Sequence, residues 1–290
     1  MKYAAPATVE EAQALLADDA DAQVFAGATD LVPQMRAGRP APSLLVDLKR
    51  IDRLTSVTHE DGRWTIGAAT PTADLTRNEA FTAAFPGLSE GAGLIGSDQI
   101  QNRSSLGGNL ANASPAADSV PALIANDGQA VIATADGTRT VPAAEVATGP
   151  GHTSLADGEF IVEFTLADPP AGTGDAYLRM IPRTEMDIAI VGAAVRVTVD
   201  GDTISDATVV LGAVAPTAVV VPDAAAALVG ASVAGGTLND SATAALAEAA
   251  EAACDPIDDK RGTIAYRRRV AGVLARRAAA IAVERARNGA

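Results

Sequence analysis

Cysteine and histidine are nearly missing from this chain of 290 residues, which has one cysteine (Cys254) and two histidines (His59 and His152). A single cysteine excludes a disulfide within the chain. It also excludes an iron–sulfur cluster held by this chain alone, since such clusters need about four thiolate ligands. The two histidines lie in unrelated sequence contexts, so we expect neither a histidine-rich metal site nor a Ser-His-Asp triad. Any redox chemistry of this protein must therefore come from an organic cofactor.

Basic charge and long apolar runs are also in short supply. The chain has 22 Lys and Arg against 36 Asp and Glu, a net charge of −14, which argues against a nucleic-acid partner because phosphate backbones select basic surfaces. No apolar run approaches the roughly 18 residues of a membrane-spanning helix, and the first residues lack the apolar core of a signal peptide. We expect a globular protein in the cytoplasm or at the inner face of the membrane, and not an integral membrane protein.

Arginines do gather near the C-terminus, where seven lie between Arg267 and Arg287. On an otherwise acidic protein this group forms either a docking surface or an ordinary solvated helix face with cations near its C-terminus. Both interpretations stay open at this point.

Hydrophobic patterning and turn residues divide the chain into two parts. The first part alternates short apolar strands with helices, with strands expected at 24–26, 44–46, 64–68, 130–134 and 159–166. A stretch rich in Pro, Gly and Asp at 167–175 is typical of a linker or a long turn. Beyond it, we expect strands at 188–199 and 207–214 and Ala-rich helices at 240–253 and 263–287. This pattern predicts an α/β region, 1–172, and a smaller α+β domain, 173–290.

Two glycine-centred loops are the most informative motifs. The first, at 26–30, reads Ala-Gly-Ala-Thr-Asp after an apolar strand, and the second, at 104–109, reads Ser-Ser-Leu-Gly-Gly-Asn. Glycine allows close backbone approach and positive φ, and consecutive N–H groups in such turns form anion-binding concavities. Two loops of this kind predict a cradle for the pyrophosphate of a dinucleotide. Neither loop matches the Rossmann fingerprint or the P-loop, so those two folds are not supported.

Two charged side chains allow two interpretations each. Asp118 follows Asn109 by nine residues, and its carboxylate could accept a hydrogen bond from a ribose hydroxyl or cap a helix. Arg179 could pair with a phosphate or with a carboxylate. For Arg183 and Asp187, four residues apart, a surface ion pair is the simpler interpretation.

The run from Gln99 to Asp118 resembles the FAD-binding medium subunit of molybdenum hydroxylases, the carbon monoxide dehydrogenase and xanthine dehydrogenase family. The family pattern is roughly Gln-Ile-Arg/Gln-Asn-x-x-Thr-Ile/Leu-Gly-Gly-Asn followed by Ala-Ser-Pro-x-x-Asp. The first loop resembles the family's Ala-Gly-Gly-Thr-Asp, and the segments 183–189, 266–268 and 274–278 also fit. The resemblance covers nearly the whole chain in order.

The resemblance implies an α+β fold. It consists of a vanillyl-alcohol-oxidase (PCMH)-type FAD-binding domain of two α/β subdomains, and a C-terminal domain of a small antiparallel sheet with helices. Both loops would hold the FAD pyrophosphate through backbone amides, with Asp118 on the adenosine side and with Ile161 and Arg179 near the flavin. It implies no catalytic and no metal-binding residue on this chain. The implied FAD-binding positions are Phe25, Ala26, Gly27, Ala28, Thr29, Asp30, Ile95, Ser104, Ser105, Leu106, Gly107, Gly108, Asn109, Asp118, Ile161 and Arg179.

Several positions depart from the commonest family residues, including the conservative changes Ser105 and Leu106 in place of Thr-Ile. Ala28 replaces the second glycine of the first loop, which costs about 1 kcal/mol or more if that position needs positive φ. Ile95 stands where some members have an aromatic contact, and Gln101 stands where many have Arg.

The function implied by the resemblance is electron transfer. A small partner subunit would carry two [2Fe–2S] clusters, and a large partner subunit would carry the molybdenum cofactor and oxidise the substrate, in a dimer of heterotrimers. This chain would pass the electrons from FAD to NAD, a quinone or oxygen. The substrate class (carbon monoxide, a purine, an aldehyde or an N-heterocycle) is not specified by this chain. Two alternatives stay open: a stand-alone flavin oxidoreductase, and a scaffold subunit whose FAD site has degenerated.

Overall fold

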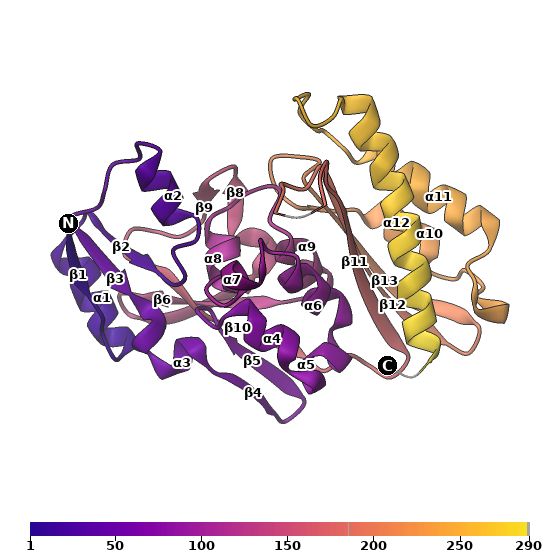
Figure 1. Cartoon of the computed structure of the whole chain (residues 1–290). Helices are drawn as coiled ribbons and strands as arrows, with labels where there is room; N and C mark the ends of the chain where they lie inside the picture. Colours follow the sequence, from indigo (N-terminus) through magenta and orange to yellow (C-terminus); the bar gives the residue numbers. More distant parts are fainter. Residues whose placement is uncertain (185, 289–290) are drawn as a thin grey trace.

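The computed structural model describes residues 1–184 and 186–288. The N-terminal part and the C-terminal part lie side by side, and the long helix α12 (Ile264–Arg287) runs along the outer side of the C-terminal part (Figure 1).

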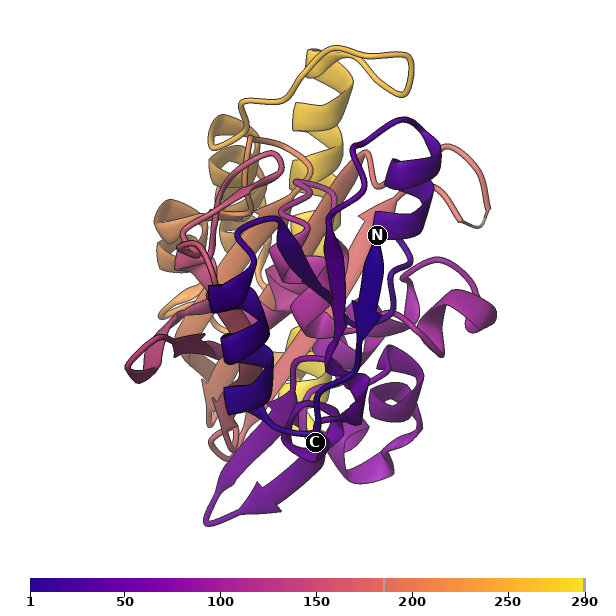
Figure 2. The same ribbon diagram turned by 90° about the vertical axis from the view of Figure 1, so that its left-hand side faces the viewer.

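A small parallel sheet forms the N-terminal end of the molecule. Its strand order is β1-β3-β2, and Figure 2 shows it from the end of the molecule. Helix α1 packs beside it, and it begins at Thr8, whose hydroxyl accepts a hydrogen bond from the Glu11 N–H at 3.1 Å. The elements here are β1 (Lys2–Ala4), α1 (Val9–Asp18), β2 (Ala22–Phe25), α2 (Leu31–Arg36), β3 (Leu44–Asp47), η1 (Leu48–Arg50) and α3 (Asp52–Thr55).

A five-stranded antiparallel sheet of order β4-β5-β10-β6-β7 is the centre of the N-terminal part. Strand β10 sends Phe160 and Val162 into a core with α1 and the small sheet, and Ile161 into a second core with the helices of the other face. A β-bulge between Ile161 and Glu163 reverses the alternation, so Phe164 also joins the second core. The elements are β4 (Val57–Glu60), β5 (Arg63–Gly67), α4 (Thr72–Arg77), α5 (Glu79–Ala84), α6 (Pro86–Gly93), α7 (Asp98–Gln101), α8 (Leu106–Ala111), α9 (Ser119–Ala125), β6 (Gln129–Thr134), β7 (Gly137–Pro142), η2 (Ala143–Glu145), β8 (Ala147–Gly149), β9 (His152–Thr153) and β10 (Phe160–Ala167).

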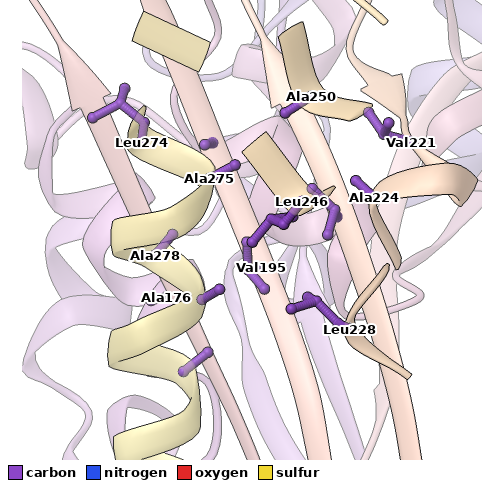
Figure 3. Packing of buried hydrophobic residues seen from close by; sticks show 14 of the residues in the cluster. Ala176, Val195, Val221, Ala224, Leu228, Leu246, Ala250, Leu274, Ala275 and Ala278 are labelled. Atoms are coloured by element: carbon purple, nitrogen blue, oxygen red, sulfur yellow. The ribbon is translucent and has the colours of Figure 1, made fainter. Parts of the chain in front are cut away.

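The C-terminal part is a four-stranded antiparallel sheet of order β11-β12-β13-β14 with α10, α11 and α12 against one face. Alanines recur on the buried side of α12, among them Ala271, Ala275 and Ala278, which lets the helix lie close to the strands (Figure 3). The elements are β11 (Thr173–Met180), β12 (Val191–Asp200), β13 (Thr203–Gly212), β14 (Val219–Val220), α10 (Pro222–Leu228), η3 (Ala234–Gly236), α11 (Asp240–Ala252) and α12.

The linker or long turn expected at 167–175 is irregular only at 168–172. The stretch 167–175 ends in the first three residues of β11, and Thr173 and Asp175 are buried there. Gly174 is needed for packing, not for a turn, because a Cβ at that position would overlap the carbonyl oxygen of Ala282 on α12. The irregular connection is therefore shorter than its composition indicated, and a division between residues 172 and 173 stays a proposal.

The second face of the C-terminal sheet packs against the N-terminal part. Tyr177, Ala194 and Val210 on this face belong to the same hydrophobic core as helices α6 and α9, whereas Ala176 faces the core under α12. Because the two parts share a core, the boundary between them is a packed interface of fixed geometry.

The C-terminal arginines have mixed roles. Arg267 is buried and donates to the carbonyl oxygen of Ile190 at 2.6 Å and to Asp259 at 2.7 Å. Arg285 binds Glu90 of the N-terminal part at 2.5 Å, and Arg287 binds Asp202 at 2.8 Å. These three therefore serve internal packing, so neither sequence-based interpretation fits the whole group; Arg276 and Arg277 are exposed.

No helix among the described residues combines the length and the apolar character that crossing a membrane requires.

Candidate functional site

The two glycine loops meet at a cleft of about 310 Å³ between the small sheet and helix α8. Strand β2 ends at the first loop, and the second loop leads into α8. Eleven of the sixteen expected site residues line this cleft: Phe25, Ala26, Gly27, Ala28, Thr29, Asp30, Ile95, Ser104, Ser105, Gly108 and Asn109. The structure thus brings together segments that lie about 80 residues apart in the sequence.

Two glycines allow the loops to approach their neighbours. A Cβ on Gly27 would overlap the backbone carbonyl of Arg103, just before the second loop. A Cβ on Gly107 would lie 2.5 Å from the carbonyl oxygen of Ala68. Since real Cβ atoms do not approach so closely, both positions require glycine for close packing, and Gly27 holds the two loops together.

The first loop presents unused hydrogen-bond donors. In the described part of the chain, no acceptor is found for the backbone N–H groups of Gly27, Ala28 and Thr29, all of which line the cleft. Unpaired backbone donors are costly unless water or a ligand binds them. The loop is supported from behind by Lys49, whose ammonium group donates to the carbonyl oxygen of Ala26 at 2.7 Å and lies 4.4 Å from the centre of the Phe25 ring.

The second loop uses its glycine amides internally. The Gly107 N–H donates to the Ala68 carbonyl at 3.1 Å, and the Gly108 N–H donates to the Ser105 hydroxyl oxygen at 3.1 Å. The N–H groups of Ser105 and Leu106 have no acceptor among the described residues. In the second loop, therefore, the available donors precede the Gly-Gly pair, which serves to start α8 and to pack it.

The polar side chains of the second loop are partly committed. The Ser104 hydroxyl lies 2.9 Å from the Thr72 hydroxyl. Asn109 accepts through Oδ1 from the Ser119 hydroxyl at 2.7 Å, which fixes the amide and leaves its Nδ2 group as a donor in the cleft wall. Burial raises the pKa of Asp30 on the opposite side of the cleft.

Ala28 adopts a left-handed conformation with φ of 58°. Alanine in this region is strained by about 1–2 kcal/mol because its Cβ crowds the following carbonyl. Replacing Ala28 with glycine should raise the free energy of unfolding by about 0.5–1 kcal/mol, once the greater flexibility of unfolded glycine is subtracted. Urea unfolding checks this. The control is Ala26→Gly, in the same loop but at a position without positive φ, which should lower the free energy of unfolding. A lower free energy of unfolding in Ala28→Gly would contradict the proposed strain at Ala28.

Asp118 and Arg179 lie outside the cleft and bind each other. The Asp118 carboxylate accepts from Arg179 at 2.5 Å and from the Tyr177 hydroxyl at 2.9 Å, in the interface between the two parts of the chain. The two charged side chains are 9% and 7% exposed. Asp118 stands at the start of α9 but makes no side-chain capping bond. The expected roles of Asp118 on the adenosine side and of Arg179 near the flavin therefore concern a single ion pair, and both stay predictions.

Burial raises the pKa of Asp118 from 3.8 to about 6, against the lowering effects of Arg179 and Tyr177. The folded protein therefore holds this proton more tightly than the unfolded chain does. The contribution of Asp118 to stability should fall as the pH rises from about 4 to about 6, by on the order of 3 kcal/mol, and level off above. Unfolding of the protein and of Asp118→Asn across this range measures it; parallel pH profiles would contradict the shift.

The last two expected positions, Leu106 and Ile161, do not line the cleft. Leu106 and Ile161 are buried and belong to one hydrophobic core with Ala68 and Leu110. Among residues 1–184 and 186–288, no group of three His, Cys, Asp or Glu side chains is placed to hold a metal ion.

Sequence reasoning missed part of the cleft wall. The additional lining residues come from β2, α2, the end of α8 and a turn after β8: Gln23, Val24, Leu31, Gln34, Arg39, Ala111, Asn112 and Gly151. Gln34 lies on α2 and Arg39 follows the end of α2, and neither belongs to a motif of its own. The position of Arg39 adds a cation to a cleft that already offers N–H donors.

Comparison with known proteins agrees with this geometry. Residues 1–168 match the family described as "FAD binding domain in molybdopterin dehydrogenase", and residues 176–282 match "CO dehydrogenase flavoprotein C-terminal domain". The chain is 35% identical over 278 residues to the carbon monoxide dehydrogenase medium chain of Hydrogenophaga pseudoflava, covering 96% of this chain and 95% of that one. It is 32% identical over 217 residues to the xanthine dehydrogenase FAD-binding subunit of Escherichia coli O157:H7, with 74% of each chain covered.

A solved structure extends the similarity to three dimensions. In carbon monoxide dehydrogenase from Hydrogenophaga pseudoflava, one chain superimposes with a TM-score of 0.92 at 36% identity, covering 98% of both chains. The α+β fold expected from the sequence, an FAD-binding domain followed by an antiparallel sheet with helices, is confirmed. The chain therefore belongs to the FAD-binding medium subunits of molybdenum hydroxylases, of the carbon monoxide dehydrogenase and xanthine dehydrogenase type.

Proposed function

We propose that the cleft binds the pyrophosphate of FAD and that this chain is the flavin-bearing electron carrier of a three-subunit complex. The observation that carries the proposal is the set of unpaired N–H groups of Gly27, Ala28 and Thr29 at the cleft. A pyrophosphate accepts such hydrogen bonds in a concavity of this kind. The Ser105 and Leu106 N–H groups and the Asn109 Nδ2 group add donors from the second loop, and Arg39 adds a positive charge.

The residues of this chain would orient the cofactor. Gly27 brings the two loops close together and Gly107 packs the second loop against Ala68, so that the donors of both loops face one anion. We place the Asp118–Arg179 pair toward the flavin half, because it lies in the interface between the two parts, beyond Asn109 and Ser119. There a buried guanidinium, already held by a carboxylate, supplies a fixed local charge that tunes a flavin.

When bound, FAD would accept electrons from the [2Fe–2S] clusters of a small partner subunit and release them to NAD, a quinone or oxygen. The large partner subunit would hold the molybdenum cofactor and oxidise the substrate. Supporting this division of labour, the chain has one cysteine, too few for an iron–sulfur cluster of its own. The assembly as a dimer of heterotrimers and the cytoplasmic location stay predictions.

Anaerobic reduction of the FAD-loaded chain tests the proposal. Mixing with the reduced iron–sulfur subunit of the same complex should bleach the visible flavin bands, whereas the organic substrate alone should leave them unchanged. Bleaching by substrate in the absence of partners would favour a stand-alone flavin oxidoreductase. A loaded chain that the iron–sulfur subunit cannot reduce would contradict the electron-carrier role.

The alternative of a scaffold subunit with a degenerate FAD site is based on two departures from the family pattern, Ala28 and Ile95. Ala28 nevertheless adopts the left-handed conformation that the loop needs, and its N–H group stays unpaired at the cleft. Ile95 lines the cleft without an aromatic ring. This arrangement favours a working site over a degenerate one.

A further inference from the structure

Helix α2 forms one side of the cleft but has little apolar anchorage. Of its six residues only Leu31 is buried, and none of the six belongs to the three hydrophobic cores. Val32 is 36% exposed. Figure 1 shows α2 at the upper edge of the N-terminal part, apart from α4, α5 and α6. Its position must therefore depend largely on polar contacts.

Gln34 makes the polar contact that crosses the cleft. Its Nε2 group donates to Oδ1 of Asn112 at 3.1 Å, and its Oε1 accepts from Nη1 of Arg39 at 2.5 Å. Asn112 directly follows α8. The bond therefore joins α2, which follows the first loop, to the end of α8, which begins in the second loop. All three side chains belong to the cleft wall.

The position of α2 also determines the position of the first loop. The Val32 N–H donates to the Ala28 carbonyl at 3.1 Å, and the Gln34 N–H donates to the Asp30 carbonyl at 2.9 Å. The loop that carries the unpaired donors therefore leads directly into α2 and is hydrogen-bonded to the first residues of that helix. A displacement of α2 away from α8 would move these N–H groups away from a ligand.

We propose that Gln34 is a positioning residue of the cofactor cleft. By binding Asn112 it holds α2 against α8, which keeps the first loop in its binding geometry and sets how long FAD stays bound. This inference rests on the proposed FAD binding. Segments with few buried apolar contacts open most readily, so loss of the Gln34–Asn112 link should accelerate FAD release more than it slows FAD entry.

The test is the rate of FAD release from Gln34→Met, Asn112→Ala and the double variant, followed by flavin fluorescence after dilution. Methionine keeps the length of the glutamine side chain and removes both hydrogen bonds. Asn112→Ala should release FAD about fivefold faster, since one net hydrogen bond of about 1 kcal/mol is lost. Gln34→Met also loses the hydrogen bond from Arg39 and should release FAD at least as fast. The double variant should be little faster than Gln34→Met, because the two side chains share that bond. Val32→Ala, on the same helix, is the matched control and should leave release unchanged.

Unchanged release in both single variants would overturn the inference, as would fully additive effects or an equal acceleration in Val32→Ala. Failure of the unsubstituted chain to bind FAD would instead count against the proposed function. If Gln34→Met does not fold, Asn112→Ala and Val32→Ala still decide the outcome. Thermal unfolding of the FAD-free variants separates loss of the Gln34–Asn112 bond from general destabilisation. Loss of this bond alone should leave the melting temperature nearly unchanged.

Discussion

Substitution of Gly27 by alanine should abolish retention of FAD, although it adds a single methyl group. The new Cβ would overlap the backbone carbonyl of Arg103, and a backbone atom cannot move aside as a flexible side chain does. The two loops must then separate, at about 1–3 kcal/mol or more of folding stability. The donors of the first loop also lose their geometry, and if about 3 kcal/mol of charge-assisted hydrogen bonding goes with them, FAD affinity falls roughly 100-fold.

A spectroscopic titration of the purified variant with FAD measures this effect. Gly149→Ala is the control, because a Cβ at Gly149 meets nothing within 4 Å. It should bind FAD as the unsubstituted chain does. Normal FAD affinity in Gly27→Ala would mean that close contact between the loops is not needed for the cleft.

Removal of the Arg179 charge should destabilise the protein strongly. Replacing Arg179 with methionine leaves the Asp118 carboxylate buried without its cation, for which about 3–5 kcal/mol is expected. The loss should be larger at pH 8 than at pH 5, because the pKa of Asp118 is about 6 even with the cation present and protonation removes the buried charge. Adding Asp118→Asn to the variant should restore part of the stability.

Arg183→Met provides the comparison, since Arg183 binds Asp187 at 2.7 Å but its side chain is 70% exposed. An exposed pair contributes at most about 1 kcal/mol. Urea unfolding followed by circular dichroism distinguishes the two. Equal destabilisation by both substitutions would show that the interface around Asp118 is wetter than its burial indicates.

The sequence predicted the cleft better than it predicted the surroundings of the cleft. Glycine loops are local signals, because a requirement for close approach or positive φ restricts the residue type at that position itself. The Asp118–Arg179 pair joins residues 61 positions apart, and no local pattern links them. Gln34 and Asn112 are 78 positions apart, and each looks like an ordinary polar residue of a helix or its end.

The expectation of a linker or long turn failed at residues 173–175 for a similar reason, because these residues begin β11. Pro, Gly and Asp are typical of turns, yet Gly174 lies in a buried strand. Glycine is needed there because helix α12 approaches the strand too closely for a Cβ. The Gly107–Gly108 pair shows the same difference: its position at the cleft was predictable, but the use of both amides in internal bonds depends on Ala68 and Ser105. Such tertiary contacts decide what a glycine is for, and a single sequence does not contain them.

The most direct test of the central claim is the visible spectrum of the purified chain after FAD has been added and the excess removed. The two-loop cleft predicts the flavin bands at about one FAD per chain, and their loss in Gly27→Ala. Absence of flavin from the unsubstituted chain, both alone and co-purified with its partner subunits, would contradict the assignment of this cleft to FAD.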